Sequence, residues 1–244
     1  SAKMNIVIPM AGKGLRFSKA FGAPKPLIKI NGEPMVEAAV RSLGLKGKYI
    51  FITRDEVGGP ELTTLLNTLV RFGHVESVKI ITIKSLTDGP AATVLKAKAF
   101  INSSEPLVVA NCDQIMWWDG ALARRFLENC GYDGVLVTYY CNNPKNSYVK
   151  INREGHATEV REKEVISNIA SNGIHFWAKG EDLISSAEAD IENNSRAVNG
   201  EFYIAPSYNH MIKEGLKVGI YHIPNFQHHA VGTPEDLREY INLK

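Results

Sequence analysis

Residues 4–40 read MNIVIPMAGKGLRFSKAFGAPKPLIKINGEPMVEAAV and contain the features that decide the fold. The apolar run from Met4 to Pro9 predicts a buried strand, which is followed by a short loop containing Gly12 and Gly14. An amphipathic pattern near residues 34–43 then predicts a helix. We interpret this order as a strand that brings a phosphate-binding loop to the edge of a sheet.

The composition of this loop suits a polyphosphate. Because glycine has no side chain, the backbone at Gly12 and Gly14 can bring its N–H groups close to an anion. Arg16 adds a planar guanidinium that matches phosphate oxygens, and Lys25, between two prolines, adds a mobile positive charge. A glycine pair by itself also fits an ordinary turn, and a single lysine also fits a solvated surface. Together they indicate a triphosphate site.

Composition limits the function further. The chain has 244 residues, 44% hydrophobic residues and a net charge of +2, which allows a substantial core and disfavours nucleic acid or an anionic membrane as partner. Cys112, Cys130 and Cys141 lack CxxC spacing, so we expect reduced cysteines and a cytoplasmic protein. We also expect neither a membrane span nor a signal peptide.

The first half of the chain alternates between strand-like and helix-like segments. This alternation predicts an α/β fold with a Rossmann-like, mostly parallel sheet flanked by helices, whose ligand crevice lies at the carboxyl ends of the strands. The expected strands are near 4–9, 49–53, 78–83 and 106–110, and the expected helices near 34–43, 60–71, 90–101 and 119–129.

The second half predicts a small antiparallel extension of this mixed sheet. Its expected strands are near 133–141, 147–151, 157–162, 172–177 and 217–222, and its expected helices near 181–190, 203–214 and 234–242. We expect one domain over 1–244, with a nucleotide-binding half at about 4–130 and an acceptor-binding half at about 131–244.

Two further segments in the first half contain residues suited to binding. Asp113 ends the predicted buried strand PLVVANCD, which places its carboxylate in the crevice as a hard ligand for Mg²⁺; a turn-capping role is the alternative. In DGPAATVL at 88–95, Gly89 allows a planar base to approach the chain and Thr93 offers a hydroxyl. A simple helix start with Pro90 in its first turn fits the same residues.

The landmarks MAGKGLRF (10–17), PKPL (24–27), DGPAATVL (88–95), NCDQ (111–114), VREK (160–163), NGEFY (199–203) and VGTPEDL (231–237) occur in this order. Over nearly the whole chain they resemble the sugar nucleotidyltransferase family, also called nucleoside-diphosphate-sugar pyrophosphorylases. The resemblance implies a GT-A-like nucleotidyltransferase fold and transfer of a nucleoside monophosphate from a nucleoside triphosphate to a phosphorylated sugar or small polar acceptor. Pyrophosphate would be released, Mg²⁺ would assist, and the product would serve capsule or other surface-polysaccharide synthesis.

The resemblance also implies roles for individual residues. Arg16 would hold the β and γ phosphates, Lys25 would steady the reacting phosphates, and Asp113 would bind Mg²⁺. The other expected nucleotide-binding residues are Met10, Ala11, Gly12, Lys13, Gly14, Asp88, Gly89, Pro90, Thr93 and Asn111. The expected acceptor-binding residues are Glu162, Lys163, Asn172, Gly173, Asn199 and Glu201. A solvated Glu162–Lys163 pair, and a helix start capped by Asn199, remain alternatives.

One position departs from the family pattern. Many members have an aspartate two residues before the glycine of the late GT motif, where this chain has Ala230. Either His228 or His229 replaces the missing carboxylate, or Asp113 and the phosphates hold the metal alone; we prefer the second, because carboxylate suits Mg²⁺ better than histidine.

Other functions and properties remain open from the sequence. A glycosyltransferase of related fold is the alternative enzyme, although NCDQ at 111–114 offers one acid where a DxD motif would offer two. A non-catalytic nucleotide-sugar-binding regulator is a third class. The nucleotide (CTP, UTP or dTTP), the acceptor and a homo-oligomeric state are not determined.

Overall fold

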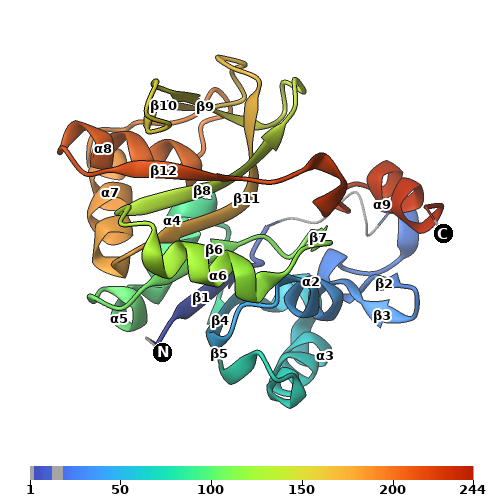
Figure 1. Ribbon diagram of the computed structural model, residues 1–244. Helices are drawn as coiled ribbons and strands as arrows, with labels where there is room; N and C mark the ends of the chain where they lie inside the picture. The colour runs from blue at the N-terminus through green and yellow to red at the C-terminus, as the bar shows by residue number, and fades with distance from the viewer. Residues whose placement is uncertain (1–2, 13–18, 244) are drawn as a thin grey trace.

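The computed structural model describes residues 3–12 and 19–243, and Figure 1 shows a central sheet with helices on both sides. Parallel strands form one half of this sheet in the order β5 (Val75–Ile83), β4 (Gly47–Arg54), β1 (Asn5–Pro9) and β6 (Leu107–Ala110). All of them coincide with strands predicted from the sequence. The mostly parallel α/β core is therefore confirmed.

Strands from the second half of the chain continue the same sheet. β11 (Ile169–Trp177) pairs antiparallel with β6, and β8 (Gly134–Tyr140) pairs antiparallel with β11. β9 (Ser147–Ile151) and β10 (Ala157–Glu162) form an antiparallel pair joined to β11, whereas β12 (Val218–His222) runs parallel to β8. The antiparallel extension is confirmed, and both halves share one sheet. The assignment of a single domain stays a prediction.

Helices cover the two faces of the sheet because side chains alternate along each strand. Ile6 and Ile8 belong to the core cluster formed with α2 (Met35–Leu43), α3 (Asp55–Asn67) and α6 (Gly120–Asn129). Val7 belongs to the opposite cluster, under α4 (Pro90–Val94), α5 (Lys98–Ile101), α7 (Gly180–Glu192) and α8 (Tyr208–Lys213). Figure 1 shows β1 between these layers.

Three expected helices have different bounds. The helix expected at 60–71 begins at Asp55, turns at Gly59 (φ 54°) and is followed by a 3₁₀ turn at Leu69–Arg71. The segment 90–101 is divided into α4, a 3₁₀ turn at Leu95–Ala97 and α5. The helix expected at 203–214 is a 3₁₀ turn at Ala205–Ser207 followed by α8, because proline in the turn removes a backbone donor.

Short strand pairs near the crevice were not predicted. β2 (Lys29–Ile30) pairs with β3 (Glu33–Pro34), and β7 (Gln114–Met116) pairs antiparallel with β13 (His228–Ala230). β13 follows a 3₁₀ turn at Asn225–Gln227 and precedes α9 (Pro234–Ile241). β7 starts directly after Asp113, so its pairing helps to fix the position of that carboxylate.

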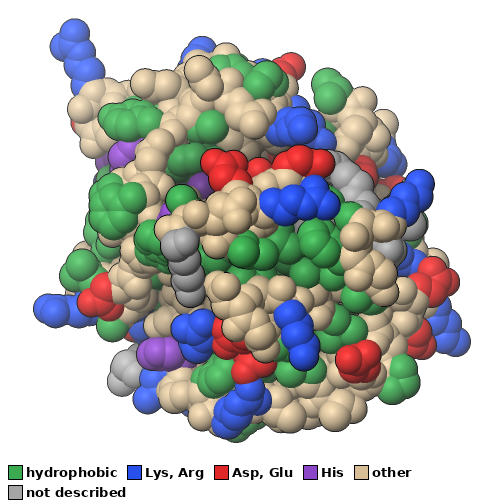
Figure 2. Space-filling model, turned by 90° about the vertical axis from the view of Figure 1, so that its right-hand side faces the viewer, with side chains coloured by type: hydrophobic (Ala, Val, Ile, Leu, Met, Phe, Trp, Pro, Cys, Tyr) green, Lys and Arg blue, Asp and Glu red, His purple; other side chains and the backbone are tan. Residues whose placement is uncertain are grey.

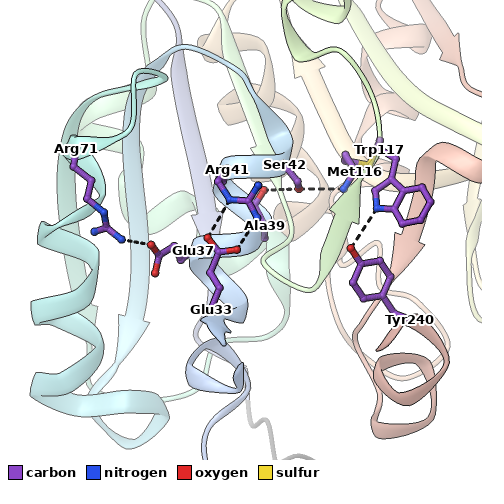
Figure 3. A network of polar contacts seen from close by, with 9 residues as sticks. All are labelled: Glu33, Glu37, Ala39, Arg41, Ser42, Arg71, Met116, Trp117 and Tyr240. Atoms are coloured by element: carbon purple, nitrogen blue, oxygen red, sulfur yellow. Dashed lines mark hydrogen bonds and ion pairs between the residues drawn. The ribbon is translucent and has the colours of Figure 1, made fainter. Parts of the chain in front are cut away.

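A network of polar contacts secures β7 between α2 and α9 (Figure 3). The Met116 N–H donates to Ser42 Oγ at 3.0 Å, and this hydroxyl donates to the Ala39 carbonyl at 2.9 Å. Trp117 Nε1 donates to the Tyr240 hydroxyl at 3.2 Å. The chain after Asp113 is thus tied both to α2, which follows the predicted phosphate loop, and to α9.

The surface around α9 mixes side-chain types. Figure 2 looks at the side of the molecule on which α9 lies in Figure 1, and acidic and basic side chains lie beside exposed hydrophobic ones there. This mixture agrees with a net charge of +2. In the part of the chain that the structure describes, the helices are all too short or too polar to cross a bilayer.

A buried histidine in β11 should make stability depend on pH. Burial lowers the pKa of His175 from 6.5 to about 4. Below pH 6.5 the unfolded chain therefore binds a proton that the folded chain does not, so stability falls between pH 6.5 and about 4. When the pH is lowered from 7.5 to 5, the free energy of unfolding should decrease in both proteins. We expect the decrease to be about 2 kcal/mol larger in the wild type than in His175→Gln. Urea unfolding of both at these pH values measures the difference; parallel pH profiles would contradict it.

Candidate functional site: two cavities that share Asp113

The first cavity lies at the carboxyl ends of β1 and β6, where the parallel sheet predicts a ligand crevice. Its volume is about 130 Å³, and its lining residues are Pro9, Met10, Gly12, Lys25, Pro26, Val57, Asn111, Cys112 and Asp113. The structure thus brings together the predicted loop glycine, lysine and aspartate. The predicted site residues Lys13, Gly14 and Arg16 lie outside the described residues.

Lys25 and Asp113 form an ion pair at the wall of this cavity. Lys25 Nζ donates to Asp113 Oδ2 at 3.2 Å, although the residues are 88 positions apart. Lys25 lies in a 3₁₀ turn (Lys25–Leu27) after Pro24, which restricts its backbone, and Pro26 is buried beneath it. The side chains are 26% and 30% exposed, so both charges face the cavity rather than the core.

Cys112 lines the same cavity but is not a nucleophile. Burial raises the pKa of its thiol to about 12, so the thiol stays protonated near neutral pH. The chemistry of this cavity therefore rests on charge and oxygen ligands.

A second cavity of about 470 Å³ adjoins the first and shares Asn111 and Asp113 with it. Of the predicted acceptor-binding residues, Glu162, Asn172 and Gly173 line it. The predicted nucleotide residue Pro90 also lines it. Asn172 and Gly173 form an irregularity in β11, and Gly173 has φ +96°; a Cβ there would lie 2.4 Å from Asn111 Nδ2. Glycine is required at this close approach.

The segment 88–93 packs against the chain of the second half. Phe202 N–H donates to the Asp88 carbonyl at 2.7 Å, and Ala91 N–H donates to the Phe202 carbonyl at 2.9 Å. A Cβ at Gly89 (φ +110°) would lie 2.7 Å from the Phe202 carbonyl oxygen. The close approach that demands glycine in this structure is thus to residues 201–202.

The remaining residues of this segment have protein partners. The Thr93 hydroxyl lies 2.6 Å from the Thr87 hydroxyl and 3.2 Å from the Gly89 carbonyl, and Asp88 meets Arg196 at 3.4 Å. Among the described residues that line the two cavities, Asp88, Gly89 and Thr93 are absent. Their contacts with a nucleotide stay predictions.

Tyr203 organises the predicted acceptor residues of the second half. Lys163 Nζ donates to its hydroxyl at 3.1 Å, and this bond raises the pKa of Lys163; Asn199 Nδ2 donates to the same hydroxyl at 2.7 Å. Of these three residues Tyr203 lines the 470 Å³ cavity. Asn199 Oδ1 accepts from the Glu201 N–H, so Asn199 forms a local turn and the alternative of a helix cap was wrong, since α8 starts at Tyr208.

Glu162 is set apart from Lys163, its neighbour in the chain. Its carboxylate accepts from the Ser147 hydroxyl, and burial raises its pKa. The alternative of a solvated Glu162–Lys163 surface pair is therefore not what the structure shows.

Gln114 and His228 line the larger cavity, and the sequence did not predict either as an acceptor-binding residue. Gln114 is 5% exposed, and within the described residues its Nε2 has no hydrogen-bond partner. His228 stacks on Tyr139 at 4.2 Å, and its Nδ1 also lacks a described partner. Burial lowers the pKa of His228 to about 4, so it is neutral near pH 7. These atoms can bond polar groups of an acceptor. Gln114 ends the landmark NCDQ, whereas His228 lies outside the landmarks.

Ala230 and Gly232 both line the larger cavity together with Asp113. Ala230 is paired with Gln114 in the β7–β13 ladder, and a Cβ at Gly232 would lie 2.8 Å from Asp113 Oδ2. The role of position 230 in a metal site stays a prediction. The His229 ring lies tilted against Trp117, with the ring centroids 4.0 Å apart, so His229 belongs to a surface aromatic group. Asp236, in the first turn of α9, lines the same cavity as Asp113.

Replacing Gly232 with alanine should lower activity without unfolding the protein. The added methyl group would push against Asp113 Oδ2, the oxygen that Lys25 also contacts. We expect a loss of about tenfold in kcat/KM, which corresponds to about 1.4 kcal/mol. Gly73→Ala is the control, because a Cβ there meets nothing within 4 Å. Steady-state kinetics on both variants test this, and equal activities would contradict it.

Comparison with known proteins agrees with this geometry. The family model described as the MobA-like NTP transferase domain matches residues 6–171. The chain belongs to the MobA-like NTP transferase family. The matched residues include most of β1, the segment that follows it, Lys25 and Asp113. The match confirms the resemblance to sugar nucleotidyltransferases.

Similar proteins extend the comparison of this NTP transferase. It is 27% identical over 231 residues to the bifunctional protein GlmU of Clostridioides difficile, a match that covers 88% of this chain and 46% of GlmU. The chain thus spans about half the length of the curated relatives it matches.

Two solved structures share the fold of this NTP transferase. The nucleoside-diphosphate-sugar pyrophosphorylase from Vibrio cholerae RC9 has a TM-score of 0.81 at 23% identity, with 97% of this chain and 99% of that chain covered. The inositol-1-phosphate CTP transferase from T. maritima has a TM-score of 0.75 at 16% identity, with 100% and 95% covered. The nucleotidyltransferase fold is therefore confirmed.

Proposed function

We propose that this protein transfers a nucleoside monophosphate from a nucleoside triphosphate to a phosphorylated sugar or small polar acceptor. An oxygen of the acceptor phosphate attacks the α-phosphorus, the bond between that phosphorus and the bridging oxygen to the β-phosphorus breaks, and pyrophosphate leaves. The observation that carries this proposal is the sharing of Asn111 and Asp113 by the two cavities. A triphosphate in the smaller cavity and an acceptor phosphate in the larger one would meet at these residues.

The chain's own groups suit the charge changes of this reaction. Negative charge builds on the α-phosphoryl oxygens and on the departing pyrophosphate, and positioned cations stabilise it. Lys25 is such a cation, because its turn between prolines holds it at the wall of the smaller cavity. Gly12 lines the same cavity and leaves its backbone accessible to phosphate oxygens. Gln114 and His228 would bond the acceptor.

The residues present fit a magnesium ion held by one carboxylate. Mg²⁺ commonly binds one or two carboxylates together with substrate phosphates and water. Asp113 supplies such a carboxylate, and the described residues contain no group of three acidic, histidine or cysteine side chains arranged for a metal. Bound there, Mg²⁺ would neutralise phosphate charge and align the two substrates. Without the ion, Asp113 orients Lys25.

We further propose that the product is an activated precursor for capsule or other surface-polysaccharide synthesis in the cytoplasm. The sequence resemblance supports this role. Two proteins of the same fold are described as acting on related compounds: a putative glucose-1-phosphate thymidylyltransferase and an inositol-1-phosphate CTP transferase. The polar lining of the larger cavity suits an acceptor rich in hydroxyl or amine groups.

A panel assay tests the proposal. CTP, UTP and dTTP are each combined with Mg²⁺ and with hexose 1-phosphates, inositol 1-phosphate and phosphorylated amino alcohols, and pyrophosphate release is measured. Release that requires both substrates is the expected result. Consumption of a nucleotide sugar without pyrophosphate would identify the glycosyltransferase alternative instead. Nucleotide-sugar binding without turnover of any pair would identify the regulator.

A further inference from the structure

Arg54, the last residue of β4, has a buried guanidinium directly behind the start of the phosphate loop. Its side chain is 8% exposed, and its Nε donates to the Ala11 carbonyl at 2.9 Å. One terminal nitrogen meets the Glu56 carboxylate at 3.0 Å, and Glu56 is 77% exposed. Arg54 does not appear among the described residues that line either cavity of the site. It therefore touches the loop rather than a ligand.

The contact continues the sheet beyond the end of β1. Pro9, the last residue of β1, is in register with Ile52 of β4, and the Met10 N–H donates to the Ile52 carbonyl at 2.8 Å. Two residues further along β4, the Arg54 side chain holds the carbonyl of the next loop residue, Ala11. Gly12, which lines the smaller cavity, follows at once. The Arg54 side chain thus holds the backbone at Ala11, directly beyond the last backbone hydrogen bond between this chain segment and β4.

Removing this donor would free the loop to turn. Ala11 is 5% exposed, and a buried carbonyl that loses its partner is unfavourable, so the peptide would rotate toward another donor or toward water. Rotation of this peptide would redirect the N–H of Gly12, which belongs to the same peptide group, and phosphate binding by a backbone N–H depends on its direction. A rigid guanidinium suits this task better than a flexible ammonium group, because its fork reaches Ala11 and Glu56 together.

We propose that Arg54 is a positioning residue for the triphosphate: its guanidinium holds the Ala11 carbonyl, and the N–H of Gly12, which belongs to the same peptide group, is thereby presented to the phosphates. This inference rests on the proposed nucleotidyl transfer. Glu56 orients the guanidinium from the solvent side.

Binding of inorganic tripolyphosphate with Mg²⁺, measured by calorimetry, tests the inference without knowledge of the base or the acceptor. CTP, UTP and dTTP are titrated in parallel into the wild type, Arg54→Met and Arg54→Lys. We expect Arg54→Met to weaken tripolyphosphate and the accepted triphosphate by the same factor of about ten or more, a difference of at least about 1.4 kcal/mol. Arg54→Lys should lose at least about fivefold, because the ammonium group keeps the charge but not the fork.

Arg124→Met is the matched control. Like Arg54, Arg124 contacts both a carboxylate and a backbone carbonyl: it donates to Glu128 at 2.6 Å and to the Lys46 carbonyl. Lys46 lies just before the first residue of β4, at the end of the strand opposite to Arg54. We expect it to lower the melting temperature while leaving tripolyphosphate affinity within twofold of the wild type. If Arg124→Met lost as much tripolyphosphate affinity as Arg54→Met, the role of Arg54 would be structural only, and the inference would be overturned.

The remaining outcomes are also decisive. Wild-type affinity in Arg54→Met would overturn the inference, and so would wild-type affinity in Arg54→Lys, since charge alone would then suffice. If Arg54→Met does not fold, Arg54→Lys decides. A wild-type protein that binds neither tripolyphosphate nor any triphosphate would instead refute the proposed function.

Discussion

Asp113→Asn is expected to reduce kcat/KM by about a thousandfold, or about 4 kcal/mol, the largest effect of any single substitution in the site. Asp113 is the one acid that lines both cavities among the described residues. Asparagine keeps the size of the side chain but removes the negative charge that would hold Mg²⁺ and that orients Lys25 at 3.2 Å. The measurement is pyrophosphate release by the substrate pair that the wild type accepts, with Mg²⁺ varied.

Asp119→Asn provides the matched control for this experiment. Asp119 caps α6 by accepting from the Ala121 and Leu122 N–H groups, and asparagine caps helices equally well. We expect this variant to stay within about twofold of the wild type, since caps of similar quality are exchanged. Retention of more than about a tenth of wild-type kcat/KM by Asp113→Asn, a loss below about 1.4 kcal/mol, would contradict the role of Asp113.

Lys25→Met is expected to have the second-largest effect, a loss of about a hundredfold to a thousandfold in kcat, or about 3 to 4 kcal/mol. Methionine retains much of the apolar stem that packs near Pro26 but removes the charge. The loss should appear in kcat more than in KM, because the charge matters most while pyrophosphate departs. The two parameters are measured with the triphosphate varied at saturating acceptor.

The dependence on Mg²⁺ gives a second readout for Lys25. Lys25 Nζ competes with a cation for Asp113 Oδ2, so its removal should lower the Mg²⁺ concentration needed for half-maximal activity. Lys29→Met is the control, because Lys29 is exposed on β2 four positions later. Activity of Lys25→Met equal to that of Lys29→Met would refute the assignment of Lys25.

Much of the site geometry was predictable because it depends on parallel strands. Asn5–Pro9 and Leu107–Ala110 are short apolar runs, and once they lie side by side their carboxyl ends must meet. The approach of Lys25 to Asp113 follows from that arrangement. The role of the loop arginine, Arg16, stays a prediction because it lies outside the described residues.

The acceptor side was less predictable because its contacts cross large distances along the chain. The register of β7 with β13 joins Gln114 to Ala230, and strands of three residues carry almost no periodicity. Gly232, which follows this ladder, lies against Asp113. No local signal in the sequence marks that contact.

The sequence by itself determined the sheet, the loop that follows its first strand, and the lysine and aspartate of the smaller cavity, because hydrophobic periodicity and strand direction are local properties. Only the tertiary structure decided that Gln114 and His228 line the larger cavity, that Gly89 meets Phe202, and that Arg54 holds Ala11. Such contacts depend on side-chain direction across elements distant in the chain, which no local pattern encodes.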